Sequence, residues 1–225
     1  MQQDRTAVRW LEPIVALLTL ILLLATPLLV YVRPSFAELQ YRRAGFPPAD
    51  RFGDAERLRL SRPLIDYLRH RASYADMAAL RTDAGKAALT PAELSHMADV
   101  RRVMDSFYWA EGVAVVALLA LALWLWRARR AITLTRGLRR GVLLTVGLMA
   151  VILIAVAIDF DRFFMVFHSL FFTNGTWVFS YRDTLIQLYP LPFWVTAVTA
   201  YVVTILLLAA LLWGLATRVD RRARR

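Results

Sequence analysis

The chain alternates between four long apolar stretches and segments that are rich in charged residues. A helix rises 1.5 Å per residue, so each stretch is about long enough to cross a hydrocarbon core of about 30 Å. Apolar residues occupy every face of these helices, which is typical of membrane spans and not of amphipathic surface helices. We therefore predict an all-α integral membrane protein with four transmembrane helices, at 11–32, 107–126, 141–158 and 193–216.

The connecting segments differ in length and in charge. The loop at 127–140 holds six arginines and no acidic residue, and the tail at 217–225 holds five arginines and Asp220. Because basic residues concentrate on the cytoplasmic side of membrane proteins, we predict that this loop and both termini are cytoplasmic. No cleavage site follows the first apolar stretch, so we expect it to be a retained anchor of a multi-pass protein in a bacterial plasma membrane.

The long segments at 33–106 and 159–192 are then extracytoplasmic, within a single membrane domain that spans the whole chain. They hold 15 basic and 13 acidic residues, so the formal net charge of +11 comes mainly from the cytoplasmic side. We therefore expect membrane lipids, and no nucleic acid, as partners. The chain has no cysteine, which excludes disulfides, thiolate metal sites and a cysteine acyl-enzyme.

The extracytoplasmic segment 33–106 is rich in helix-forming residues, and it contains one clear helix start. Thr90 can cap this helix, Pro91 takes its first position, and Glu93 completes a capping box. No helix-breaking residue follows before the second span. We therefore predict one long helix from Pro91 to about Trp126, with its first four turns outside the membrane.

His96 lies on these outer turns, and Asp99 shares its helix face three residues later. Asp99 is placed to orient the imidazole or to hold its proton. The same spacing is equally typical of a solvated surface pair, and the sequence leaves both interpretations open.

A short amphipathic helix is predicted earlier in the same segment, from Pro63 to Arg71, because Leu64, Ile65 and Leu68 share one side. His70 falls on its polar face between two arginines. We expect this histidine to be solvated.

The segment 159–192 begins with phenylalanines at helical spacing, and it predicts an amphipathic helix in the outer lipid interface. Asp161, Phe164, His168 and Phe171 form one stripe of that helix. A polar side chain at this depth is costly unless it has a partner, which favours a functional His168. The alternative is an aromatic belt that only anchors the protein.

Each of the two extracytoplasmic segments contains one block of motifs. In the first segment they comprise Leu94-Ser95-His96-Met97-Ala98-Asp99-Val100-Arg101. In the second segment they comprise Asp159-Phe160-Asp161, Phe167-His168, Phe171-Phe172, Asn174, Trp177, Asp183, Leu185-Ile186, Pro190 and Phe193-Trp194. Together they resemble the signature of a family of bacterial membrane proteins, the lipoprotein intramolecular transacylases, known as Lit. The four-span layout with a large first outer segment is also similar to that family.

The resemblance implies a specific substrate, the N-terminus of a diacylglyceryl-modified lipoprotein. An acyl chain would leave the glyceryl oxygen at sn-2 and arrive on the α-amino group of the N-terminal cysteine, giving a lyso-form lipoprotein. This reaction is the aminolysis of an ester, and it needs a base that works near neutral pH, for which histidine is suited.

On this resemblance we assign His168 as the general base and His96 as the partner acid or oxyanion stabiliser, although these two roles could be exchanged. Asp99 and Asp161 are candidates to orient the imidazoles. Supporting or substrate-binding roles are expected for Asn174, Trp177 and Asp183. We expect no metal and no cofactor.

Two other classes of function stay open from the residues alone. A metal-dependent membrane hydrolase would use His96, His168 and an aspartate as ligands, although no H-E-x-x-H or comparable spacing supports it. A non-catalytic scaffold or accessory protein would carry the same histidines in a structural role.

Overall fold

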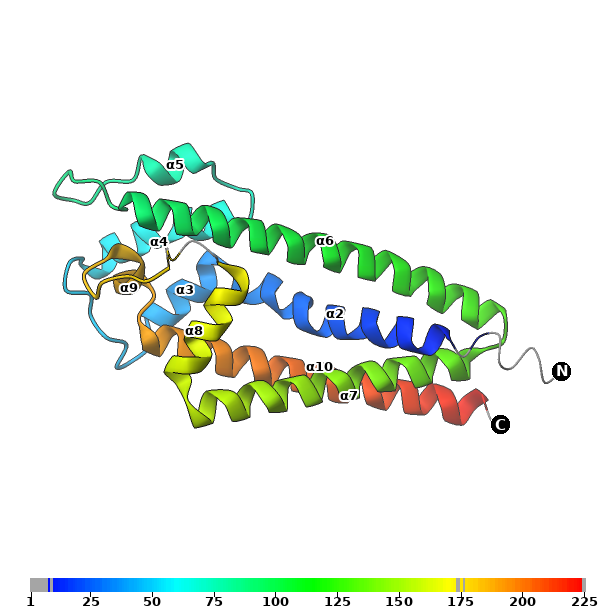
Figure 1. Ribbon diagram of the computed structural model, residues 1–225. Helices are drawn as coiled ribbons and strands as arrows, with labels where there is room; N and C mark the ends of the chain where they lie inside the picture. The colour runs from blue at the N-terminus through cyan, green and yellow to red at the C-terminus, as the bar shows by residue number, and fades with distance from the viewer. Residues whose placement is uncertain (1–7, 9, 173–174, 176, 224–225) are drawn as a thin grey trace. The chain divides into compact units, whose positions relative to one another are not determined.

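The computed structural model of the chain describes residues 8, 10–172, 175 and 177–223, and helices dominate this part (Figure 1). Besides its helices, the described part has an isolated antiparallel β-bridge between Arg81 and Ala87. Four helices are long and apolar enough to cross a membrane: α2 (Leu11–Tyr31), α6 (Pro91–Arg127), α7 (Ala131–Ile158) and α10 (Leu191–Ala223). The predicted fold class, an all-α integral membrane protein, is confirmed.

The remaining helices are short or of medium length. They are α3 (Pro34–Tyr41), α4 (Asp54–Leu68), α5 (Tyr74–Ala78), α8 (Phe160–Phe171) and α9 (Thr184–Leu188). The chain divides into two compact units. Unit 1 comprises Met1–Leu28, Phe107–Asp159 and Tyr201–Arg225, and unit 2 comprises Leu29–Ser106 and Phe160–Ala200.

Unit 1 is held together by close packing of apolar helices. A Cβ atom added to Gly141 of α7 would lie 2.5 Å from Cβ of Thr19 on α2, and one added to Gly137 would lie 2.5 Å from Cβ of Val15. Only glycine therefore allows this separation of α2 and α7. Small residues spaced four apart are a common basis of helix pairing in membranes.

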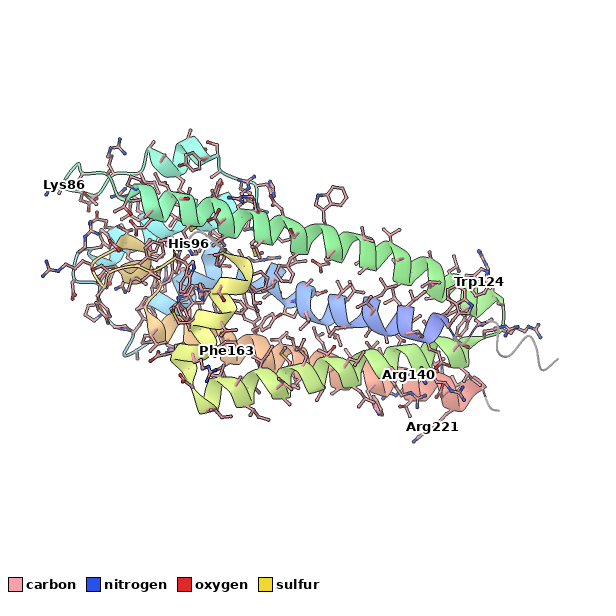
Figure 2. The ribbon with its side chains drawn as sticks, in the orientation of Figure 1. Lys86, His96, Trp124, Arg140, Phe163 and Arg221 are labelled. Atoms are coloured by element: carbon pink, nitrogen blue, oxygen red, sulfur yellow. The ribbon has the colours of Figure 1, made fainter. Side chains whose placement is uncertain are left out.

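Two of the buried carboxylates in unit 1, Glu12 and Asp220, have arginine partners. Glu12 lies 2.8 Å from a guanidinium nitrogen of Arg140, which Figure 2 labels. Asp220 pairs with Arg139 and accepts a hydrogen bond from Thr135. The partners neutralise charges that would be costly to bury alone.

Unit 2 has its own hydrophobic core, centred on α4. Leu60 and Leu64 of this helix are almost fully buried, and they cluster with Met77, Met97 and Leu188. The core therefore joins α4 to α5, α6 and α9.

The prediction of a helix from Pro63 to Arg71 is wrong at its start, because α4 begins at Asp54 and includes Pro63 as an internal residue. A proline inside a helix removes one backbone hydrogen bond. Burial of Leu60 and Leu64, one on each side of Pro63, offsets that loss.

Candidate active site

The helix that carries His96 begins as predicted. The Thr90 hydroxyl accepts a hydrogen bond from the Glu93 amide at 3.3 Å, and the Glu93 carboxylate accepts one from the Thr90 amide at 2.8 Å. The predicted capping box is therefore present, and α6 is one continuous helix from Pro91 to Arg127. His96 lies in the second turn of this helix (Figure 2).

Glu93 has a second contact that the local sequence does not indicate. Its side chain is fully buried, and its other oxygen accepts a hydrogen bond from the Leu185 amide of α9 at 2.7 Å. One carboxylate thus caps the starts of α6 and α9 together. The Thr184 hydroxyl adds a hydrogen bond to the carbonyl of Ala88, just before α6.

The turn before α9 is closed by Asp183, whose carboxylate accepts a hydrogen bond from the Ser180 amide at 2.6 Å. This turn follows Phe179, whose ring lies 5.3 Å from the imidazole of His96 between centroids. Asp183 therefore shapes the loop that covers one side of His96.

His96 sits in an apolar, aromatic environment. The ring centroid of Phe172 lies 5.0 Å from that of His96, in addition to the contact with Phe179. Nδ1 of His96 is buried and has no hydrogen-bond partner in the described part of the chain. Burial, and to a smaller extent the nearby His168, lower the pKa of His96 to about 4, although Asp99 opposes the shift. His96 is therefore neutral at neutral pH.

His168 lies on α8, and its tautomer follows from one hydrogen bond. Its Nδ1 lies 2.8 Å from the carbonyl oxygen of Phe164, one turn earlier. A carbonyl can only accept, so Nδ1 carries the proton. Burial lowers the pKa of His168, although the hydrogen bond to Phe164 opposes this. The imidazole is then neutral, and Nε2 presents a lone pair.

The two histidines share an aromatic neighbour. Phe172 lies 5.0 Å from the imidazole of His96 and 5.8 Å from that of His168, measured between ring centroids. Both histidines belong to unit 2, which brings together segments about 70 residues apart in sequence. Trp177 covers His168 at 5.0 Å and is itself largely buried.

The carboxylates expected to orient the imidazoles have other positions. Asp99 is buried and forms an ion pair with Arg102 on its own helix. Asp161 is exposed in the first turn of α8, and the carbonyl of Phe164, not this aspartate, bonds to His168. A side chain on a helix can reach the carbonyl four residues earlier on the same helix. This explains why the carbonyl of Phe164, and not an aspartate, holds His168. Asn174 lies outside the described residues.

His70 differs from the prediction of a solvated residue. Its ring is half exposed, but Nδ1 lies 2.5 Å from Arg101 and Nε2 lies 2.6 Å from the carboxylate of Asp105. Both nitrogens are occupied, because helices α4 and α6 pack against each other there. His70 therefore offers no free base.

Sequence reasoning gave no role to Phe172, to Phe179 or to the second contact of Glu93. Phe172 had a signal in the Phe171-Phe172 motif of the family resemblance, whereas Phe179 had only the aromatic richness of the segment. Among the described residues, no three His, Asp or Glu side chains come close enough to hold a metal ion. The site combines one neutral base with one neutral imidazole of unused hydrogen-bonding capacity, in largely aromatic surroundings.

Comparisons with known proteins identify a family and similar solved structures. A family described as "Lipoprotein intramolecular transacylase Lit" matches residues 13–194. An uncharacterized protein of Aquifex aeolicus strain VF5 is 30% identical over 162 residues, which are 71% of each chain.

Solved structures of a membrane integral lipoprotein intramolecular transacylase Lit from Bacillus cereus share the fold. A form with one histidine replaced by arginine has a TM-score of 0.68 and 19% identity, over 99% of this chain and 96% of that one. Another has a TM-score of 0.67 and 17% identity, over 100% and 99% of the two chains.

Proposed function

We propose, because this chain belongs to the lipoprotein intramolecular transacylase (Lit) family, that it transfers an acyl chain within a diacylglyceryl-modified lipoprotein. The α-amino nitrogen of the N-terminal cysteine would attack the sn-2 ester carbonyl. A carbon–nitrogen bond forms, the bond to the glyceryl oxygen breaks, and one proton moves from nitrogen to that oxygen. The ester and the amine belong to one molecule, so much of the entropic barrier to their meeting is already removed.

The observation that carries this proposal is the tautomer of His168. With Nδ1 held by the carbonyl of Phe164, Nε2 is available to take the proton of the attacking amine. The same imidazole, once protonated, can return that proton to the departing glyceryl oxygen. A single histidine then acts first as base and afterwards as acid.

His96 is better suited to the oxyanion than to acid catalysis. Because its pKa is about 4, it holds no extra proton to donate at neutral pH. As a neutral imidazole it still has one N–H group, and its buried Nδ1 has no partner in the described part of the chain. An N–H directed at the developing negative charge would stabilise the tetrahedral intermediate.

The neighbouring residues favour acyl transfer over hydrolysis. Phe172 and Trp177 cover the histidines with aromatic surface, which excludes water from the intermediate. We assign supporting roles to Trp177, to Asp183 through its turn, and to Asp99 through its charge near His96. Asn174 and Asp161 stay predicted supporting or substrate-binding residues, although Asp161 is not the hydrogen-bond partner of His168 Nδ1.

The protein is membrane integral, and we propose its orientation from the arginines. Both termini and the loop 127–140 would face the cytoplasm of a bacterial cell, within one membrane domain. The segments 33–106 and 159–192 would then face outward, where lipoprotein N-termini are found. The apolar face of α8, with Phe160, Phe164 and Phe167 exposed, is suited to the lipid interface.

Mass spectrometry of lipoprotein N-terminal peptides tests the proposed reaction. The host should lack its own N-acylation, and the gene should be present or absent. Expression should convert the diacylglyceryl form to a lyso form with one amide-linked and one ester-linked chain, at unchanged total mass. Fragmentation separates these isomers, and diacylglyceryl peptides that stay unchanged despite verified expression would contradict the proposal.

A further inference from the structure

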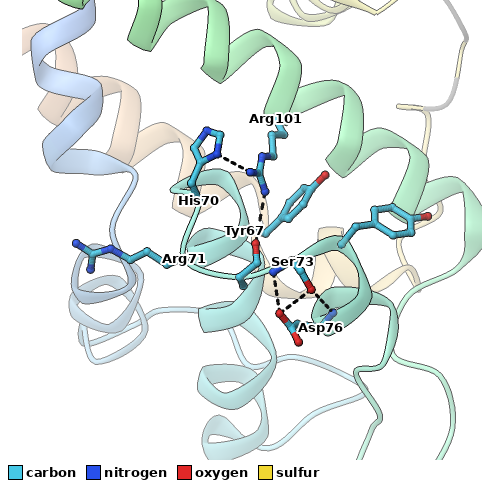
Figure 3. A pocket seen from close by; sticks show the side chains of 8 residues that line it. Tyr67, His70, Arg71, Ser73, Asp76 and Arg101 are labelled. Carbon is cyan, nitrogen blue, oxygen red and sulfur yellow. Dashed lines mark hydrogen bonds between the residues drawn. The ribbon is translucent and has the colours of Figure 1, made fainter.

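Unit 2 has a second polar site, a pocket of about 590 Å³ beside the C-terminal end of α4 (Figure 3). Arg101 of α6 forms one side of it. Its guanidinium lies 4.5 Å from the ring centroid of Tyr67, and it donates hydrogen bonds to Nδ1 of His70 at 2.5 Å and to the Ala72 carbonyl at 3.4 Å. These contacts hold the charge of Arg101 in place.

His70 fixes the direction of this guanidinium. Because Arg101 can only donate, Nδ1 of His70 must accept, and Nε2 therefore carries the proton toward Asp105. His70 adopts a φ of 60°, in the left-handed region that is uncommon for residues other than glycine. His70 is then neutral and Asp105 keeps its negative charge, so the positive charges that line the pocket are those of Arg101 and Arg71. Arg71 also lines the pocket, and its side chain extends away from Arg101 in this structure (Figure 3).

The opposite side of the pocket carries a negative charge. The carboxylate of Asp76 accepts hydrogen bonds from the amide and the hydroxyl of Ser73, both at 2.7 Å. These hydrogen bonds lower the pKa of Asp76, so that it stays ionised at neutral pH. The rings of Tyr67 and Tyr74 line the pocket as well, with 6.4 Å between their centroids.

Two contacts put the pocket at the level of lipid headgroups. Arg69, next to His70, donates hydrogen bonds to the carbonyls of Val32 at 2.7 Å and Leu29 at 3.4 Å, at the end of the apolar helix α2. On α6, Arg101 precedes the apolar part at Phe107 by six residues, which is about 9 Å of helix. Headgroups occupy a layer several ångströms thick just outside the hydrocarbon core.

We propose that this pocket binds a zwitterionic phospholipid headgroup, a phosphodiester joined to a primary ammonium group. The phosphodiester would lie against Arg101 and Arg71, because guanidinium groups bind phosphate oxygens through paired N–H donors. The ammonium group would lie near Asp76 and the tyrosine rings, which attract cations. This site is separate from the two histidines assigned to acyl transfer, and the inference does not depend on that reaction.

Native mass spectrometry of the full-length protein in detergent tests the proposal. The probes are phosphatidylethanolamine and phosphatidylglycerol with the same acyl chains, added singly or with inorganic phosphate. The wild-type protein should retain the ethanolamine lipid about fivefold more than the glycerol lipid, as one exposed ion pair allows. Inorganic phosphate at millimolar concentration should not displace it.

Single substitutions separate the two ends of the headgroup. Arg101→Gln should weaken retention of both lipids, whereas Asp76→Asn should reduce only that of the ethanolamine lipid, since asparagine can still accept from Ser73. If Arg101→Gln does not fold, Arg71→Gln tests the same end. Arg62→Gln, an exposed arginine of α4 outside the pocket, is the matched control and should behave as wild type.

Three results would overturn the proposal. Equal retention of both lipids by the wild type would remove the role of the ammonium group. An Asp76→Asn protein that keeps the wild-type preference would do the same. Displacement by inorganic phosphate would reassign the pocket to a free anion.

Discussion

Two buried carboxylates of unit 1 and the candidate active site of unit 2 hold their ionisable groups in different ways. In unit 1, Glu12 and Asp220 each face arginines, so that their charges cancel. In unit 2, Glu93 is held by backbone amides alone, and His96 and His168 are kept neutral by burial. Neutralised pairs contribute to structure but cannot exchange protons easily. Neutral imidazoles with one unpaired nitrogen can accept and release protons.

The difference teaches where chemistry is possible in a chain that is mostly apolar. Reactive groups must leave water, yet keep one atom free of partners. Unit 2 meets both requirements because aromatic rings, which offer no strong acceptor, surround the histidines. Substitution of the candidate base should therefore change activity, and substitutions at packed or capping positions in either unit should change stability.

The largest expected effect comes from His168→Asn. Loss of the general base should lower the rate of acyl transfer roughly 10²–10⁴-fold, measured as lyso-form peptide in the mass-spectrometric assay. The melting temperature in detergent should change little, because α8 has no buried residue in the structure. Ser169→Ala, on the next residue of α8, is the control and should keep wild-type activity. An active His168→Asn protein would place the base elsewhere.

Glu93→Ala should destabilise the protein by roughly 2–4 kcal/mol, since it leaves the amides of Thr90 and Leu185 buried without an acceptor. Thermal unfolding in detergent would measure the loss. Glu38→Ala removes the exposed partner of Arg42 and should cost less than about 1 kcal/mol. Equal losses in the two variants would show that Glu93 does not join α6 to α9.

Gly141→Ala should destabilise unit 1 by about 1–2 kcal/mol, because the new methyl group would overlap Thr19 and the Ala16 carbonyl, while alanine regains some helix propensity. Gly147→Ala on the same helix meets no atom within 4 Å and should be neutral or slightly stabilising. Melting temperatures of the two proteins give the comparison. The fraction of the Gly141→Ala protein that stays folded should still transfer acyl chains.

The last prediction concerns the dependence of stability on pH. The pKa of His96 is lowered to about 4 in the folded protein, whereas an unfolded histidine titrates near 6.5. The unfolded chain therefore binds the proton first, and stability that is present above about pH 6.5 is lost as the pH falls toward 4. His96→Phe should remove this pH-dependent part of the stability, so that the melting temperature changes less over that pH range. An unchanged slope would mean that His96 is not desolvated.

Local patterns predicted several features of the site. The capping box of Thr90 and Glu93 fixed the start of α6, because its hydrogen bonds join residues three apart. The phenylalanine spacing predicted α8 in the same way. The start of α4 was misread, since Pro63 is a common helix start and only burial of the preceding turn reveals otherwise. His70 was misread because Arg101 and Asp105 lie more than 30 residues away.

The sequence by itself determined the four spans, the excess of arginine on one side, and the two segments that carry the histidines. These follow from apolar length, charge and helical period, which act over a few residues. Only the tertiary structure decided that His96 is neutral and that Glu93 links two helices. Those properties depend on desolvation and on hydrogen bonds between residues far apart in sequence, such as the 92 positions that separate Glu93 from Leu185.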